Sequence, residues 1–146
     1  MNGIPYILDD RAASLANYPH ARRIGDLLFV SGVSSRRLDN THAGVILQPD
    51  GRVDLDIRAQ TRAVIENIGA ILRHAGAELA NIVDIFVMLV DMKDYAGMNE
   101  VYNEYFDAST GPTRTTCAVH QLPHPNLLIE MKAVAFVGLG REGGVL

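Results

Sequence analysis

The residues between Asp54 and His74 follow the spacing of an α-helix, and this run constrains the fold more than any other stretch of the chain. The positions on its apolar side are Ile57, Thr61, Val64, Ile65, Ile68, Leu72 and Ala75, and Gly76 follows as a stop. A second run with steps of three and four starts near Asp94 and contains Tyr95, Met98, Val101, Tyr102, Tyr105 and Phe106. The sequence therefore predicts two amphipathic helices, each with one face to bury.

Strand-like segments surround these helices. We expect strands at residues 27–32, 45–47, 82–90, 114–121 and 127–137, an arm at residues 1–17, and a Gly-rich tail at 138–146 that frays. The long polar segment 34–52 is a candidate active-site loop. This order predicts an α+β fold, in which two helices cover one face of a single mixed sheet. No predicted element is left for the other face, so we expect self-association to cover it.

Composition narrows the class of protein. A chain of 146 residues with 48% hydrophobic residues is expected to form one domain over residues 1–146. The net charge is −4 and the basic residues form no run, which argues against nucleic acid as a partner. One cysteine, Cys117, allows no internal disulfide, and there is neither an apolar leader nor a stretch of about 18 apolar residues. We expect a cytoplasmic protein without a membrane partner.

The segment Gly111-Pro112-Thr113-Arg114-Thr115-Thr116 is followed about fifteen residues later by Glu130 within an apolar run. If the Pro-rich connection between them makes an antiparallel hairpin centred on His124, residues of even number share one face. That face would carry Arg114, Thr116, His120, Glu130 and Lys132. A guanidinium that grips a carboxylate, beside a carboxylate that moves protons, suits metal-free chemistry on a small organic acid.

Each of these residues also has a structural interpretation. Arg114 could be a surface ion-pair partner, and Glu130 could pair with Lys132 at the sheet surface. Arg36 and Arg37 could be solvated charges or could reach a second acidic group of a ligand. Lone cysteines are mostly inert, so we do not expect Cys117 to be a nucleophile.

Two further patterns carry little weight. The tail residues 138–143 spell G-x-G-x-x-G, but a dinucleotide site needs a following helix and strand, for which no residues remain. His120 and His124 stand four apart, but Pro123 and Pro125 exclude the helix that would align them. We therefore expect no cofactor and no metal.

Several segments together resemble the Rid (reactive intermediate deaminase) family. They are Asn17-Tyr18, residues 28–32, residues 94–102, residues 111–115 and residues 129–131, in the family's order. Within that family, residues 31–41 and 118–125 are most similar to 2-aminomuconate deaminases of aromatic catabolism.

The resemblance implies a chorismate-mutase-like homotrimer with a central barrel, possible pairing into hexamers, and pockets at the subunit interfaces. It implies that Arg114 binds the substrate carboxylate and that Glu130 positions water. Tyr18, Ser31, Gly32 and Asn99 match pocket positions, and Thr116 stands where many members have cysteine.

The expected activity is the hydrolytic deamination of 2-aminomuconate, a small dicarboxylate, to 2-oxo-3-hexenedioate and ammonia. Arg36, Arg37 or His120 would bind the second carboxylate. Two alternatives stay open: a general 2-imino or enamino acid deaminase, and a non-catalytic, ligand-binding regulatory trimer.

Overall fold

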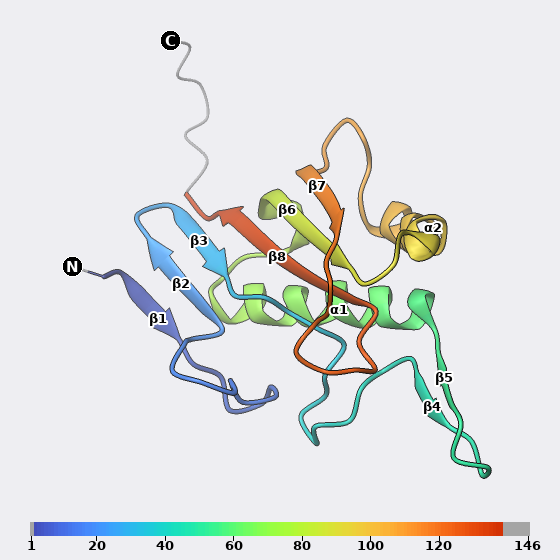
Figure 1. Ribbon diagram of the computed structural model, residues 1–146. Coiled ribbons are helices and arrows are strands. Elements are labelled where there is room, and N and C mark those ends of the chain that lie inside the picture. The colour runs from blue at the N-terminus through green and yellow to red at the C-terminus, as the bar shows by residue number, and fades with distance from the viewer. Residues whose placement is uncertain (1, 139–146) are drawn as a thin grey trace.

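The computed structural model describes residues 2–138, which form one six-stranded mixed sheet, a separate two-stranded hairpin and two α-helices (Figure 1). The elements are β1 (Ile4–Tyr6), β2 (Ala21–Ile24), β3 (Leu27–Val30), β4 (Val45–Leu47), β5 (Val53–Leu55), α1 (Ile57–His74), the 3₁₀ turns Leu79–Asn81 and Met92–Asp94, β6 (Ile82–Leu89), α2 (Tyr95–Tyr105), β7 (Thr113–Ala118) and β8 (Ile129–Phe136). The large sheet has the order β1-β2-β3-β8-β6-β7, and β4 pairs only with β5. The predicted α+β class with a mixed sheet is confirmed.

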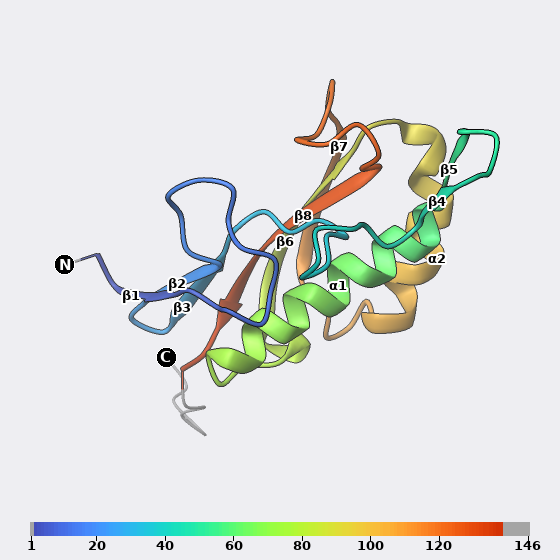
Figure 2. The same cartoon turned by 90° about the horizontal axis from the view of Figure 1, so that it is seen from below.

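Both helices lie on one face of the sheet, as predicted (Figure 2). Helix α1 begins after Asp56, whose carboxylate accepts hydrogen bonds from the backbone amides of Arg58 and Ala59 at 2.9 and 3.1 Å. Its buried side packs on the sheet, and Met98 and Tyr102 of α2 join the same core. Gly76 follows the helix with a φ of +74°, a conformation that glycine adopts without strain. Neither helix combines the length and hydropathy that crossing a bilayer requires.

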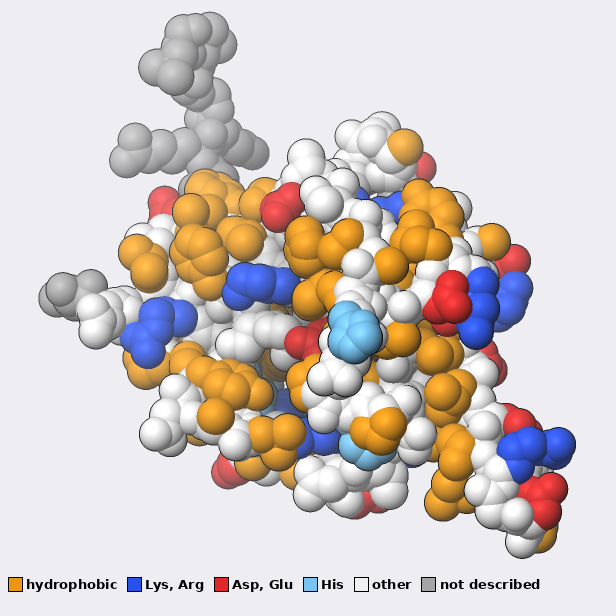
Figure 3. Space-filling view, viewed as in Figure 1, with side chains coloured by type: hydrophobic (Ala, Val, Ile, Leu, Met, Phe, Trp, Pro, Cys, Tyr) orange, Lys and Arg blue, Asp and Glu red, His pale blue; other side chains and the backbone are white. Residues whose placement is uncertain are grey.

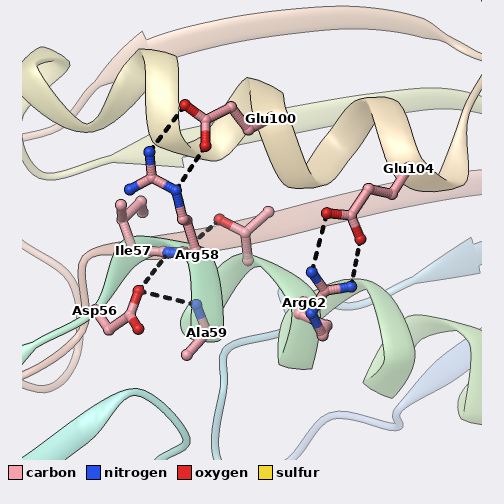
Figure 4. Close-up of polar contacts among 8 residues, drawn as sticks. Asp56, Ile57, Arg58, Ala59, Arg62, Glu100 and Glu104 are labelled. Carbon is pink, nitrogen blue, oxygen red and sulfur yellow. Dashed lines mark hydrogen bonds and ion pairs between the residues drawn. The ribbon is translucent and has the colours of Figure 1, made fainter.

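Two bidentate ion pairs join α1 to α2 on the outside of the helix layer (Figure 4). The Arg58 guanidinium donates to the Glu100 carboxylate at 2.6 and 2.8 Å, and Arg62 donates to Glu104 at 2.6 and 3.0 Å. These pairs fix the register of two amphipathic helices whose apolar sides already meet.

The arrangement of the last two strands differs from the predicted hairpin. Strand β8 lies between β3 and β6, and β7 pairs with β6 in parallel, so β7 and β8 are not neighbours. Helix α2 supplies the crossover that a parallel β6–β7 pair needs, and the ten-residue connection 119–128 carries the chain past β6. The hairpin prediction was wrong because alternation within a strand does not determine which strand lies beside it.

The new register also separates residues that the hairpin would have brought to one face. Arg114 is the partner of Ile85 on β6, whereas Glu130 is the partner of Met88, three residues further along the same strand. Because side chains alternate along a strand, Arg114 and Thr116 face the helices, while Glu130 and Lys132 face the opposite side. His120 lies beyond the end of β7. The predicted single face was therefore wrong.

The N-terminal region is more ordered than the predicted arm. Residues 4–6 form β1, which pairs with β2 so that Ile4 is opposite Arg23. Neither strand shows a clear apolar alternation, and both are held by pairing at the edge of the sheet. Residues 139–146 of the predicted tail lie outside the described residues, and the glycine motif at 138–143 lies there except for its first residue.

The sheet face opposite the helices carries large exposed hydrophobic side chains. Leu27 and Phe29 of β3, Phe86 of β6 and Phe136 of β8 point to it and are between 36% and 45% exposed. Figure 3 looks onto this face and shows hydrophobic side chains spread across it. Within residues 2–138 no helix or loop covers it, in agreement with the expectation from the sequence.

Candidate functional site

A cavity of about 670 Å³ opens beside the start of β8, and Glu130 forms part of its wall. Tyr18 and the Ser31-Gly32 pair line it as well, the latter immediately after β3. The Ser31 hydroxyl donates to the carbonyl oxygen of Pro19 at 2.7 Å, and the Ser31 amide donates to the carbonyl of His20 at 2.9 Å. These bonds fix the backbone that faces Glu130.

Glu130 is a half-buried carboxylate without a cationic partner. Lys132, two residues along, donates instead to the carbonyl oxygen of Val30 at 3.2 Å. Within residues 2–138 no Lys, Arg or His nitrogen lies within 4.0 Å of the Glu130 carboxylate, so the alternative Glu130–Lys132 ion pair is not formed. Burial raises the pKa of Glu130 above its ordinary value. A carboxyl in this state exchanges protons closer to neutral pH than a solvated one.

The carboxylate of Glu130 lies directly against the backbone of Gly32. A Cβ atom at position 32 would lie 2.2 Å from Oε1 of Glu130. Only glycine leaves room for this approach, which explains the Ser-Gly sequence at the end of β3 in steric terms. The carboxylate therefore lies at the part of the cavity wall that Gly32 forms.

Arg114 lies in a second, smaller hollow of about 390 Å³, between β7 and α2. Its guanidinium donates to Oδ1 of Asn99 at 2.8 Å and to the hydroxyl of Tyr95 at 3.2 Å. The ring of Tyr102 lies beneath it, with 4.6 Å from Cζ to the ring centroid. No carboxylate of the described chain pairs with Arg114, so the surface ion-pair interpretation does not hold. The guanidinium is positioned by neutral groups and keeps donors for an external anion.

Thr116 follows Arg114 on the same face of β7. Its hydroxyl oxygen is buried and has no hydrogen-bond partner among residues 2–138. Cys117 points to the other face, as the partner of Met88, and is half-buried. The thiol is therefore separated from Arg114 by the sheet.

The other residues predicted for the site divide between the two cavities. Arg36 and Arg37 line the cavity that contains Glu130, together with Tyr18, Ser31 and Gly32. Asn99 lines the hollow of Arg114. His120 is exposed and is part of neither wall.

Two histidines that we did not predict as ligand-binding residues from the sequence also line the larger cavity. His42 and His124 stack there with 4.3 Å between ring centroids. They come from segments 82 positions apart, so no local spacing could have paired them; only the polar character of both segments was visible. Over residues 2–138, no group of three or more His, Cys, Asp or Glu side chains is arranged to hold a metal ion.

The carboxylate and the guanidinium thus occupy two separate sites in one chain. Glu130 and Arg114 lie on opposite faces of the sheet. Each lines its own hollow, and neither has an ion-pair partner among residues 2–138. We call the surroundings of Glu130 the carboxylate half-site and those of Arg114 the guanidinium half-site.

Known proteins with similar sequences and structures share this fold. A family profile described as Endoribonuclease L-PSP matches residues 9–137. A RutC family protein of Pyrococcus abyssi is 42% identical over 119 residues, which cover 82% of this chain and 85% of the relative. Reactive Intermediate Deaminase A, chloroplastic, of Arabidopsis thaliana is 34% identical over 123 residues, covering 84% of this chain and 60% of that protein.

A solved structure of Escherichia coli TdcF with bound serine superposes with a TM-score of 0.74 at 26% identity, covering 91% of this chain and 98% of that one. The descriptions of these relatives name the family and reactive intermediate deamination, and they do not extend to the narrower 2-aminomuconate subgroup. Residues 9–137 are nearly the whole described chain, and the fold and the relatives agree with the match. The chain therefore belongs to the Rid family, whose profile is described as Endoribonuclease L-PSP.

Proposed function

We propose that this protein hydrolyses 2-imino and 2-enamino acids to 2-oxo acids and ammonia. The observation that carries the proposal is the Glu130 carboxylate, which is desolvated, has no cationic partner in the described chain and lines a ligand-sized cavity. A relative described as a reactive intermediate deaminase and a structural neighbour that holds serine support this class of substrate.

The chemistry assigns one role to each half-site. Arg114 would hold the C1 carboxylate and so orient the imine carbon. Glu130 would take a proton from a water molecule as it attacks C2, which gives a carbinolamine. With the imine nitrogen protonated at the outset, the same carboxyl would then return this proton to the amine nitrogen. The Glu130 carboxylate would accept the proton of the carbinolamine hydroxyl as the C–N bond breaks, so that ammonia leaves and the hydroxyl oxygen becomes the carbonyl of the 2-oxo acid.

This mechanism needs Arg114 and Glu130 from different copies, because the sheet separates them within one chain. The exposed hydrophobic side chains of the uncovered sheet face provide a surface for assembly. A homotrimer, in which each interface joins the guanidinium half-site of one subunit to the carboxylate half-site of the next, would contain three complete sites.

Subunit mixing tests both the reaction and the shared site. Arg114→Ala and Glu130→Gln should each be inactive alone in releasing ammonia from a freshly generated imine. After the two variants are unfolded, mixed in equal amounts and refolded, a quarter of the interfaces would pair an intact Arg114 with an intact Glu130, so activity should return to about 25% of wild type.

The mixed sample also discriminates between the alternatives. No recovery would show that one chain supplies both groups, and the shared site would be abandoned. If wild-type protein binds 2-oxo acids but releases no ammonia from any imine, the non-catalytic ligand-binding role replaces the enzyme. A ribonuclease role receives no support from a chain of net charge −4 without a basic run.

The narrower candidate is 2-aminomuconate as the substrate. It is favoured by Arg36 and Arg37, which line the same cavity as Glu130 and could hold a second carboxylate. Protonation of this enamine at carbon gives the 2-imino tautomer, and hydrolysis then gives 2-oxo-3-hexenedioate and ammonia. Faster turnover of 2-aminomuconate than of monocarboxylic imines would support this assignment.

A further inference from the structure

The stacked histidines lie in a wall of the larger cavity that is rich in positive charge. Arg36 and His42 form an isolated β-bridge, so a short closed loop presents Arg36, Arg37 and His42 together. The loop is closed by the hydrogen bond from the Arg37 amide to the carbonyl of Thr41 at 2.7 Å. His124 reaches the same place from the β7–β8 connection.

The two stacked rings differ from the third histidine of this wall. His20 is buried and both its ring nitrogens meet backbone groups: Nδ1 accepts from the amide of Leu8, and Nε2 lies 3.1 Å from the carbonyl of Ala12. In His124 only Nδ1 is engaged, as the acceptor of the Asn126 amide at 3.1 Å. A neutral His124 ring therefore carries its proton on Nε2, and that N–H is available as a donor to a ligand.

The arginines also retain donors. Arg36 donates through Nη2 to the carbonyl of Ala13, and Arg37 donates through Nη1 to the hydroxyl of Thr41 at 3.1 Å. Each guanidinium has five N–H donors, so several on each remain for an anion. Two acids near this wall are already engaged: Asp39 accepts two hydrogen bonds from Thr41, and Asp10 binds His74 at 3.0 Å and lies 3.7 Å from Arg11. Glu130, which lines the same cavity, has no Lys, Arg or His nitrogen within 4.0 Å among residues 2–138.

The groups of the described chain whose charges act on the pKa of His42 are two arginines and a histidine. Burial lowers the pKa of His42, and the charges of His124, Arg36 and Arg37 lower it further. These three are the charged or titratable groups that act on His42, and none is acidic. A concave wall with excess positive charge and free N–H donors favours an anion.

We propose that His42 and His124, together with Arg36 and Arg37, form a subsite for the second carboxylate of a dicarboxylic substrate. The subsite rests on the proposed function, because it lies in the cavity of Glu130 and selects among the acids that this carboxyl processes. It deepens that function by naming dicarboxylic imino and enamino acids as the preferred class.

His42 makes this preference depend on pH. An anion in the subsite favours protonated His42, so binding of a dicarboxylate takes up a proton as the pH falls below the ordinary histidine value of 6.5. A monocarboxylate does not reach the subsite, and its affinity should not change over this range for this reason.

Calorimetric binding of two product analogues tests the subsite directly. We expect 2-oxoglutarate to bind about ten-fold or more tightly than 2-oxobutyrate, with a difference that grows as the pH is lowered from about 7 to about 5.5. In His42→Gln/His124→Gln, 2-oxoglutarate should lose about ten-fold in affinity and its pH dependence, whereas 2-oxobutyrate should bind as in wild type. Arg37→Gln should weaken 2-oxoglutarate alone, and Arg73→Gln, an exposed arginine at the end of α1, should change neither.

Equal losses for both ligands, or no loss for 2-oxoglutarate, would overturn the subsite. The single variants His42→Gln and His124→Gln give the same comparison should the double variant fold poorly.

Ammonia release from the imines of glutamate and of 2-aminobutyrate separates this inference from the proposed function. If both imines are hydrolysed at similar rates, the subsite fails and the deaminase survives; if neither is hydrolysed while the histidine-dependent binding persists, the subsite survives and the deaminase fails.

Discussion

The helix layer and the two half-sites use the same types of charged side chain in opposite ways. Between α1 and α2, Arg58 and Arg62 each meet a carboxylate in bidentate geometry at the exposed surface (Figure 4). Hydrogen bonding from Arg58 lowers the pKa of Glu100, and Arg62 lowers that of Glu104 in the same way. These charges satisfy one another and leave nothing for a ligand.

In each half-site the central charged group, Glu130 or Arg114, has no ion-pair partner among residues 2–138. Arg114 is held by Asn99 and Tyr95, which orient it without neutralising it. Glu130 lies against Gly32 and has no Lys, Arg or His nitrogen within 4.0 Å among residues 2–138. Half-buried charges without partners reduce folding stability, and a protein retains them where a ligand or a second subunit supplies the missing charge. We therefore expect the functional groups to be the charged side chains that lack an ion-pair partner within the described chain.

The largest effects should come from removing the unpaired charges. Glu130→Gln keeps the shape of the side chain but cannot accept a proton from water, so kcat should fall about 100- to 10,000-fold. Affinity for a 2-oxo acid should change little, because Arg114 still binds its carboxylate. Steady-state ammonia release, together with calorimetric binding of 2-oxobutyrate, separates the two quantities.

Arg114→Ala should show the reverse pattern in binding, with affinity for 2-oxobutyrate lost together with turnover. The matched control is Arg58→Ala, which removes a guanidinium of the helix layer and should leave both quantities near wild type. Full activity in Glu130→Gln would show that this residue takes no part in the reaction. The lack of an ion-pair partner would then not distinguish functional charges from the paired charges between α1 and α2.

The two helices could be predicted from the sequence, and the strand order could not. The sequence also identified Arg114 and Glu130 as candidate site residues, whose roles stay a prediction. Periodicity placed α1 within three residues of its start, because one helix face must meet a core wherever that core lies. Strand alternation predicts which residues of one strand share a face, but it does not determine the phase between strands. The predicted β7–β8 hairpin therefore brought Arg114 and Glu130 to one side, although β6 lies between their strands.

A local irregularity shows the same limit on β6. Strict alternation along β6 would place Val83 on the apolar face with Ile85, Val87 and Leu89, yet Val83 is 44% exposed. A register shift between Ile82 and Asp84 places an extra residue opposite β8 and turns Val83 outward. The stacking of His42 on His124 could not be predicted from the sequence for a related reason, because it depends on two loops that only the folded chain brings together.

Gly32→Ala should give an intermediate effect. The added Cβ would lie 2.2 Å from Oε1 of Glu130, so the carboxylate must move away from its place in the wall. We expect kcat/KM to fall about 10- to 100-fold, the size of loss that misplacing a reacting group by about 1 Å produces. Circular dichroism and Tm check that the fold persists. Unchanged kcat/KM would show that the position of the Glu130 carboxylate is not critical.

The smallest effects should appear in stability, and here the two regions should respond with opposite sign. Burial raises the pKa of Glu130, so the folded chain binds more protons than the unfolded chain, and stability falls as pH rises through the folded pKa. Glu130→Gln removes this cost and should raise Tm at pH 8 by about 3 °C, equivalent to about 1 kcal/mol. At pH 4, where Glu130 is largely protonated in the folded chain, the gain should shrink.

Arg58→Ala removes an exposed, paired charge and should lower Tm by about 2 °C or less, with the difference reduced further in high salt. Thermal unfolding of both variants at pH 4 and pH 8 measures this contrast. A loss of stability in Glu130→Gln at pH 8 would mean that the carboxylate is already paired in the assembled protein. In that case the missing charge comes from a second subunit and not from a ligand, because the thermal scan contains no substrate.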